Sequence, residues 1–188
     1  MVPEASIAVS RNKPVVRVTE FITPVGEMIA VANDTHLLLF EFARRNLFDA
    51  QVERVKRAFD CTFEHGDSLI FDMLKTQLDE YFRAARREFD IPIDVPGTPF
   101  QTLVWNELQR IPIGTTTTYK RVAEAIGHPA AVRAVARANG DNRVAILIPC
   151  HRVIGSDGTL TGYGGGLPRK KQLLDLEANA VALTFPGF

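Results

Sequence analysis

The stretch TYKRVAEAIGHPAAVRAVARANG, residues 118–140, carries the strongest fold signal in the sequence. Thr118 can cap a short helix over residues 119–126, because a threonine hydroxyl accepts a hydrogen bond from an otherwise unpaired amide of the first turn. The tripeptide GHP then breaks the helix, and an alanine-rich second helix over residues 130–139 is closed by a glycine. Two short helices joined by a tight break predict a helix-turn-helix.

The second helix of this unit presents a surface that is both small and basic. Ala131 and Ala134 lie beside Arg133, and further alanines and Arg137 follow. Small side chains would let the helix backbone approach the floor of a DNA groove, and arginines would attract phosphates. The same alanines could instead pack against neighbouring helices, as in many helical hairpins without nucleic acid, so both interpretations stay open on this pattern alone.

The first half of the chain has a different pattern. Residues 15–22, 28–31 and 37–42 are rich in apolar and β-branched side chains and are separated by turn residues, which predicts a β-meander. Two helices are then predicted from apolar residues near helical spacing: Leu47, Val52, Val55 and Phe59 in one, and Phe71, Leu74, Leu78 and Phe82 in the other.

A proline-rich segment separates the two halves. Residues 91–99 contain three prolines and one glycine, a density that blocks both a helix and a central strand. We therefore predict an α+β protein with an N-terminal α/β domain over residues 1–96 and a C-terminal domain over residues 97–188. The second domain begins with a helix over residues 100–111.

The segment after the helix-turn-helix places a cysteine. Residues 144–148 form a short apolar run typical of a buried strand, and Pro149 would end that strand and deliver Cys150 and His151 onto a turn. A turn at SDG, a glycine-rich loop over residues 162–166 and a final helix over residues 169–177 complete the chain.

Cys150 is the candidate nucleophile. A cysteine attacks as its thiolate, which is a minor species at neutral pH unless a base or a positive charge is near. His151 and Arg152 are adjacent in sequence, although His151 could reach the sulfur only around a turn or through a water molecule. Asn142 and Glu177 are polar residues that could orient this arrangement. The alternative is a buried structural cysteine with a histidine beside it by chance.

Composition and charge restrict the setting. The net charge is zero, but residues 1–99 hold 12 Lys/Arg against 16 Asp/Glu, whereas residues 100–188 hold 10 against 6. The second half alone could therefore attract phosphates. No secretory signal or membrane span is seen, which predicts a cytoplasmic protein whose two cysteines are thiols. Cys61 and His65 lack a second pair with zinc-like spacing, so neither a metal site nor another cofactor is expected.

Together these segments resemble the O6-alkylguanine-DNA alkyltransferases, also called methylated-DNA-protein-cysteine methyltransferases. The run IPCHRVI at residues 148–154 matches their active-site signature. The likeness continues in colinear order through GTPFQTLVW at 97–105, IPIGTTTTY at 111–119, AVRAVARANGDN at 131–142, GTLTGYGGG at 158–166 and LLDLE at 173–177. The first half resembles the family only through TPVGEM at residues 23–28.

The resemblance implies a fold and a reaction. The N-terminal domain would be ribonuclease H-like and the C-terminal domain winged-helix-like. Cys150 would accept the alkyl group of O6-alkylguanine, and also of O4-alkylthymine, in double-stranded DNA, once and irreversibly. His151 would deprotonate it through a water, Glu177 would hold the imidazole, and Asn142 would shape the turn.

The resemblance also implies how DNA is held by a monomeric protein. Tyr119 would press on the phosphate beside the lesion and touch the flipped base, while Arg133 would fill the gap in the stack. The helix carrying Ala131 and Ala134 would lie in the minor groove. The base pocket would be walled by Val153, Tyr163 and Gly164.

Three other classes are less well supported. An alkyltransferase-like damage sensor binds such lesions without transfer, but it would lack the nucleophile that Cys150 provides. A helix-turn-helix transcription factor would carry base-reading polar side chains in place of the alanines. A cysteine hydrolase would need an oxyanion hole, which the sequence does not reveal.

Overall fold

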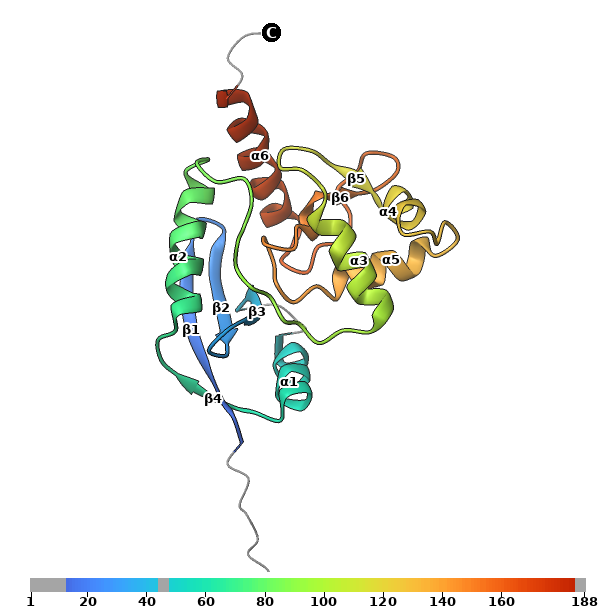
Figure 1. Ribbon diagram of the computed structural model, residues 1–188. Coiled ribbons are helices and arrows are strands. Elements are labelled where there is room, and N and C mark those ends of the chain that lie inside the picture. The colour runs from blue at the N-terminus through green and yellow to red at the C-terminus, as the bar shows by residue number, and fades with distance from the viewer. Residues whose placement is uncertain (1–12, 44–47, 185–188) are drawn as a thin grey trace, which may run out of the picture.

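The computed structural model describes residues 13–43 and 48–184. Figure 1 shows a twisted sheet with two helices in the N-terminal half and a group of helices in the C-terminal half. The division into a sheet-containing part followed by a helical part confirms the predicted α+β class. The expectations that involve residues 1–12, Leu47 and the last four residues lie outside the described part of the chain.

The sheet has four strands: β1 (Val15–Thr23), β2 (Gly26–Ala32), β3 (Leu37–Phe42) and β4 (Thr62–His65). Their order is β3-β2-β1-β4, with antiparallel pairing except for the parallel pair β1 and β4. The first three confirm the predicted meander. The sequence reading missed β4, because its four residues, TFEH, carry no run of apolar side chains.

Two helices cover opposite faces of the sheet. Helix α1 (Phe48–Phe59) packs Val55 with Val16, Val31 and Cys61 in a small apolar cluster. Helix α2 (Leu69–Phe82) covers the other face, where the main core continues into the C-terminal half. Both helices were predicted from the spacing of their apolar residues. In the structure each helix buries one stripe of apolar side chains against the sheet.

Strand β3 is buried along its whole length because its outer edge is paired. The amide of Leu37 donates to the carbonyl of Pro92 at 2.8 Å, so the proline-rich segment lies along this edge. Further along, the Phe40 amide donates to the Arg143 carbonyl at 2.8 Å, and the Ala145 amide donates back to Phe40 at 2.7 Å. The N-terminal sheet therefore anchors the segment that leads to Cys150.

Among the described residues, the C-terminal half contains four α-helices and a short two-stranded parallel sheet. They are α3 (Pro99–Gln109), β5 (Thr117–Thr118), α4 (Tyr119–Ala125), α5 (Val132–Gly140), β6 (Val153–Ile154) and α6 (Leu167–Thr184). The Thr118 hydroxyl accepts from the Arg121 amide at 3.2 Å, which confirms the predicted cap. Helices α4 and α5 confirm the predicted helix-turn-helix. No helix in the described residues is long and apolar enough to cross a membrane.

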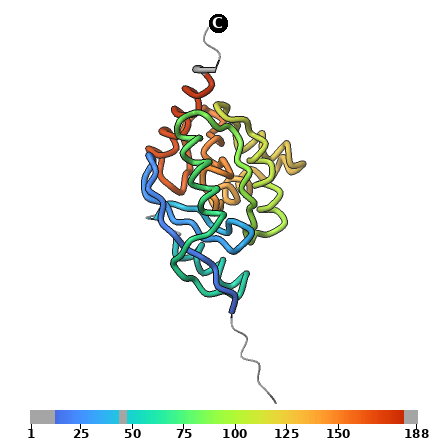
Figure 2. The backbone as a smooth tube through the Cα atoms, turned by 60° about the vertical axis from the view of Figure 1, so that its left-hand side comes forward, coloured from blue at the N-terminus to red at the C-terminus, as the bar shows by residue number. Residues whose placement is uncertain are grey.

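The two halves share more than the edge of β3. Figure 2 shows the start of α6 beside the turn between β1 and β2. There the Arg169 guanidinium donates to the Val25 carbonyl at 2.8 Å and lies over the Phe42 ring at 4.7 Å. The predicted domain division at residues 96 and 97 stays a prediction, and these contacts cross it.

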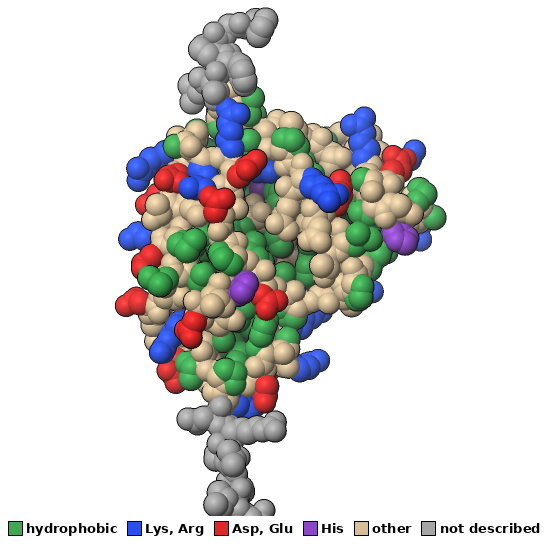
Figure 3. All heavy atoms as spheres, viewed as in Figure 1, with side chains coloured by type: hydrophobic (Ala, Val, Ile, Leu, Met, Phe, Trp, Pro, Cys, Tyr) green, Lys and Arg blue, Asp and Glu red, His purple; other side chains and the backbone are tan. Residues whose placement is uncertain are grey.

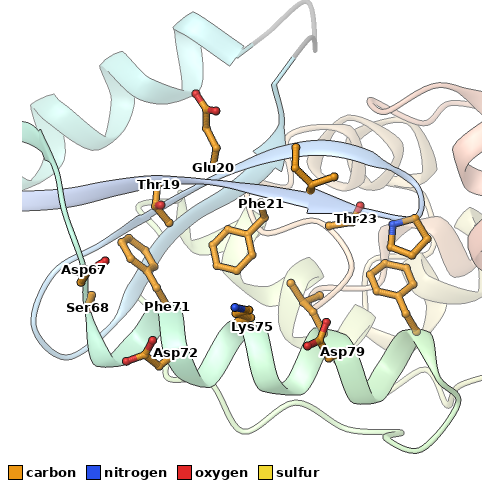
Figure 4. A pocket seen from close by; sticks show the side chains of 14 residues that line it. Thr19, Glu20, Phe21, Thr23, Asp67, Ser68, Phe71, Asp72, Lys75 and Asp79 are labelled. Atoms are coloured by element: carbon orange, nitrogen blue, oxygen red, sulfur yellow. The ribbon is translucent and has the colours of Figure 1, made fainter.

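Charge is distributed unevenly over the surface. On the face in Figure 3, more acidic side chains lie on the left, over α2 and the sheet, than on the right, over the helix-turn-helix. A hollow of about 370 Å³ between β1 and α2 is lined by Phe21 and Phe71 with Asp67, Asp72 and Lys75 (Figure 4). None of the predicted site residues lines this hollow.

Candidate active site

The segment before Cys150 is buried but is not the strand that the sequence suggested. Only Val144 pairs with β3, and Ile146 turns the chain with a φ of 73°, a left-handed value that a β-branched residue rarely adopts. Cys150 then opens a single turn of 3₁₀ helix, residues 150–152. The predicted strand over residues 144–148 was wrong, because the turn at Ile146 interrupts the ladder, whereas Cys150 does lie on a turn as predicted.

Asn142 holds the loop and the sulfur together. Its amide nitrogen donates to Cys150 Sγ at 3.1 Å and to the Ile148 carbonyl at 2.8 Å, while its oxygen accepts from the Val144 amide at 3.0 Å. Cys150 is 6 % exposed and Asn142 is 1 % exposed. A hydrogen bond donated to sulfur favours the thiolate over the thiol. Asn142 therefore links two points of this turn and also contacts the Cys150 sulfur.

His151 and Glu177 form a fully buried pair. His151 Nε2 lies 2.8 Å from Glu177 Oε1. Burial lowers the pKa of His151, and the bond to Glu177 opposes that shift only in part. The imidazole is therefore neutral near pH 7. Because the partner is a carboxylate, Nε2 carries the proton and Nδ1 is left as an acceptor. Nδ1 is buried and has no hydrogen-bond partner among the described residues.

Glu177 is fixed by a ring of donors. Arg152 donates two hydrogen bonds of 2.9 Å to its two oxygens, and the Tyr81 hydroxyl donates a third at 2.8 Å. Burial alone would raise the pKa of Glu177, but the bonds from His151 and Arg152 outweigh it and lower that pKa to about 2. The carboxylate thus stays ionised and keeps the imidazole in one orientation.

Three residues of this site were not predicted from the sequence to belong to it. Arg152 was noted only as a neighbour of the sulfur, and Tyr81 lies 96 residues from Glu177 in sequence. Lys170, which is fully buried, donates to the carbonyls of Val153 at 2.5 Å and Thr161 at 2.7 Å. Burial lowers its pKa to about 8, and the nearby Cys150 opposes the shift. No sequence signal distinguishes Lys170 from a surface lysine of the last helix.

The predicted base pocket is nearly closed. Cys150, Tyr163 and Gly164 line one hollow together with Asn139 and Glu41. Its volume is about 10 Å³, roughly the space of one water molecule. Val153 is fully buried and does not line this hollow. A nucleobase could enter only if the glycine-rich loop moved.

The predicted DNA contacts lie on the helix-turn-helix. Arg133 and Ala134 are exposed on α5, and Ala131 is the residue before its first turn. The Tyr119 hydroxyl donates toward the carbonyls of Thr161 and Gly162 at 3.3 and 3.4 Å, which joins α4 to the glycine-rich loop. Tyr119 therefore lies where the helix-turn-helix meets the loop that closes the hollow. In the described part of the chain, no three His, Cys, Asp or Glu side chains gather as a metal site.

The fold and site define a protein that couples a helix-turn-helix to a buried, hydrogen-bonded cysteine. Residues 16–95 match the family model of the 6-O-methylguanine DNA methyltransferase ribonuclease-like domain, and residues 99–179 match that of its DNA binding domain. A methylated-DNA–protein-cysteine methyltransferase of Methanosarcina barkeri is 41% identical over 157 residues, which cover 84% of this chain and 94% of that protein. The chain belongs to the methylated-DNA–protein-cysteine methyltransferase family.

Other relatives match over different spans. The protein of the same name from Mycolicibacterium paratuberculosis is 57% identical over 101 residues, which span 54% of this chain and 61% of that protein. A solved structure, the OGT of Mycobacterium tuberculosis in complex with DNA, is 38% identical with a TM-score of 0.76, covering 88% of this chain and 94% of that one. This structural match confirms the arrangement of the N-terminal sheet and the C-terminal helices.

Proposed function

We propose that this protein repairs O6-alkylguanine, and also O4-alkylthymine, in double-stranded DNA by moving the alkyl group onto Cys150. One observation carries the proposal: the Cys150 sulfur accepts a hydrogen bond from Asn142, and the next residue, His151, is paired with Glu177 of α6 and keeps a buried imidazole nitrogen without a partner among the described residues. That combination supplies a stabilised thiolate and a neutral base. Family membership supports the same reaction.

The transfer follows from these groups. His151 Nδ1 takes the thiol proton through a water molecule, and Glu177 stabilises the resulting imidazolium. The sulfur then attacks the alkyl carbon, a carbon–sulfur bond forms, and the bond from that carbon to the base oxygen breaks. The oxygen keeps the electron pair and the proton lost by the thiol finally resides on the restored base. No cofactor takes part in this balance.

The transfer inactivates the site irreversibly. The product is a thioether, and none of the groups at Cys150 can cleave a carbon–sulfur bond by hydrolysis or exchange. Each chain therefore removes one alkyl group, which makes the protein a single-turnover transferase.

Access to the sulfur requires the damaged base to leave the helix. Flipping costs a few kcal/mol, and less for a mispaired base. Helix α5 is proposed to enter the minor groove through Ala131 and Ala134, with Arg133 filling the vacant place in the stack. Tyr119 is proposed to contact the phosphate beside the lesion and the flipped base. The bonds of Tyr119 to the loop backbone support this role, because they couple the DNA face to the closed pocket.

The flipped base is proposed to occupy an enlarged form of the hollow beside Cys150. Tyr163 and Gly164 belong to the glycine-rich loop that must move, and the buried Val153 is proposed to form part of the wall of the enlarged pocket. We further propose that the protein works as a monomer in the cytoplasm, where its two cysteines, both free thiols in the structure, stay reduced.

One experiment tests the proposal directly. The protein is incubated with excess O6-methylguanine duplex, and intact mass and a peptide map are recorded over time. The expected result is a plateau at one methyl per chain, with the added mass on the fragment containing Cys150. Product accumulating beyond one equivalent would indicate a turnover enzyme. Tight binding without added mass would indicate a damage sensor, and either result would overturn the proposal.

A further inference from the structure

A second groove lies where the N-terminal domain meets the DNA-facing helix. It has a volume of about 580 Å³ and is formed by the side of α1, the first turn of α3 and one face of α5. Four arginines and one aspartate line it: Arg54, Arg57, Arg137, Arg143 and Asp141. Such an excess of positive charge in one concavity attracts anions.

Arg143 gives this groove a built donor. Its side chain is only 4 % exposed, its Nε donates to Gln51 at 2.7 Å, and its guanidinium lies 5.3 Å from the centre of the Trp105 ring. One terminal nitrogen, Nη1, is buried and has no hydrogen-bond partner in the residues that the structure describes. A buried N–H of a charged group without a partner carries a free-energy cost. An acceptor that enters the groove would remove that cost.

The electrostatic setting also favours an anion. Burial, and next the charge of Arg54, lowers the pKa of Arg143 to about 10, with Asp141 opposing the shift. Asp141 already accepts from Gln101 at 2.9 Å and lies 3.9 Å from Arg54. The groove therefore holds one carboxylate among four guanidinium groups. The positive end of α3 also opens here, at its capped first turn.

We propose that this groove binds a backbone phosphate of the DNA that flanks the lesion, so that α1 of the N-terminal domain takes part in DNA binding. Arg137 and Ala134 line the groove and are exposed on α5 with Arg133. Arg137 lies one helical turn beyond Arg133, about 6 Å along the axis. A strand held against α5 thus passes the mouth of the groove, where Arg54 and Arg57 reach it from the opposite wall. The inference rests on the proposed function, because it assumes that α5 faces DNA.

The test measures how DNA affinity depends on salt. Arg54→Gln and Arg57→Gln are combined, because both side chains are exposed and their replacement leaves the core intact. The double variant is expected to bind damaged and undamaged duplexes more weakly by the same factor, and the slope of log affinity against log salt should fall by about 0.9 for the one phosphate lost. The matched control Arg83→Gln alters an arginine that is 76% exposed at the end of α2, and it should keep the wild-type slope.

Two further measurements make the result decisive. Shortening the duplex on one side of the lesion should abolish the difference between wild type and double variant once the bound phosphate is removed. Arg143→Gln, checked for folding by its melting temperature, should lower the slope by a similar amount. An unchanged slope in both variants would overturn the inference. A groove that binds only free inorganic phosphate would also overturn the inference. In that case phosphate would raise the melting temperature of the wild type, but the salt slopes of wild type and variants would not differ.

The wild-type reaction with free O6-benzylguanine separates this inference from the proposed function. That substrate carries no phosphate, so it reports on Cys150 alone. A wild type that reacts, together with an unchanged salt slope in the variants, would refute the groove and retain the transferase. A wild type that takes no alkyl group from either O6-benzylguanine or the methylated duplex would refute the transferase, and the salt slopes would still decide whether the groove binds DNA.

Discussion

The two cysteines are buried to the same degree but in opposite surroundings. Cys61 is 5 % exposed within the apolar cluster beneath α1, and burial raises the pKa of its thiol. Cys150 is 6 % exposed, yet its sulfur accepts from Asn142, the buried Lys170 lies near it, and the next residue is the buried His151. Burial therefore does not determine whether a thiol is inert. We expect the polar and charged groups near the sulfur to do so, because they decide whether the thiolate can form.

Replacing each cysteine tests this contrast most strongly. Cys150→Ala is expected to abolish alkyl transfer completely while leaving DNA affinity nearly unchanged, because the proposed contacts with DNA lie on α4 and α5. Cys61→Ala should leave transfer almost unchanged. Mass spectrometry after incubation with methylated duplex measures both. Residual transfer by the Cys150 variant would refute the assignment, and an equal loss in the Cys61 variant would point to a mechanism that uses both thiols.

Removing the base should have the next largest effect. His151→Gln is expected to slow the reaction with free O6-benzylguanine on the order of 10²-fold, the usual contribution of a positioned base. His65→Gln is the matched control, because His65 is an exposed histidine on β4, close in sequence to Cys61. An unchanged rate in His151→Gln would show that the thiolate forms without this base.

Arg133→Ala separates access to Cys150 from its reactivity. We expect repair of duplex DNA to slow about tenfold, equivalent to about 1.4 kcal/mol, while the reaction with free O6-benzylguanine slows far less. Tyr119→Ala should slow both reactions, because its ring is proposed to touch the base itself. Single-turnover rates on the two substrates provide the comparison. Equal slowing of both by the Arg133 variant would exclude its role in flipping.

Acid should reduce the stability contributed by the polar groups around Cys150 but not that contributed by the apolar cluster around Cys61. The pKa of Glu177 in the folded protein, about 2, lies below its ordinary value of 4.5. The carboxylate therefore contributes stability that is complete above about pH 4.5 and is lost as the pH falls toward 2. The lowered pKa of His151 acts in the same direction below its ordinary value of 6.5.

Glu177→Gln should remove the carboxylate part of this dependence, as measured by urea unfolding at a series of pH values. Glu64→Gln is the matched control, because Glu64 is exposed on β4 and pairs at 3.0 Å with Arg17, whose side chain is 43% exposed. A slope of stability against pH that is the same in Glu177→Gln as in the wild type would contradict the ionised state of Glu177.

Tyr81→Phe should have the smallest effect. It removes one hydrogen bond to Glu177 and leaves the ring in the core, at a cost of about 1 kcal/mol in the free energy of unfolding. The transfer rate should fall only slightly, with its pH profile displaced, because Arg152 still holds the carboxylate. A large loss of transfer at unchanged stability would show that Tyr81 takes part in proton movement.

Local signals explain which parts of the fold could be predicted. The cap at Thr118 and the break at GHP act within a few residues, so the helix-turn-helix was readable from sequence. The turn before Cys150 was not, because Ile146 adopts a left-handed conformation that no local preference of isoleucine suggests. Only tertiary packing imposes it.

The same limit applies to the site. Cys150, His151, Asn142 and Glu177 came from a chemical pattern and a family resemblance, and the structure brings them together. Tyr81 and Lys170 have no such pattern. Their roles arise from contacts between segments far apart in sequence, which spacing cannot reveal.

The pairing at the edge of β3 has a consequence for synthesis of the protein. Phe40 leaves the ribosome well before its partners Arg143 and Ala145, and chains elongate at about 5–20 residues per second. For roughly 5–20 seconds, by that rate, the nascent sheet therefore displays an apolar strand with an open edge, the kind of surface that pairs with other chains. Residues 143–145 pair with Phe40 when they arrive, so we expect the segment that leads to Cys150 also to protect the newly made sheet from aggregation.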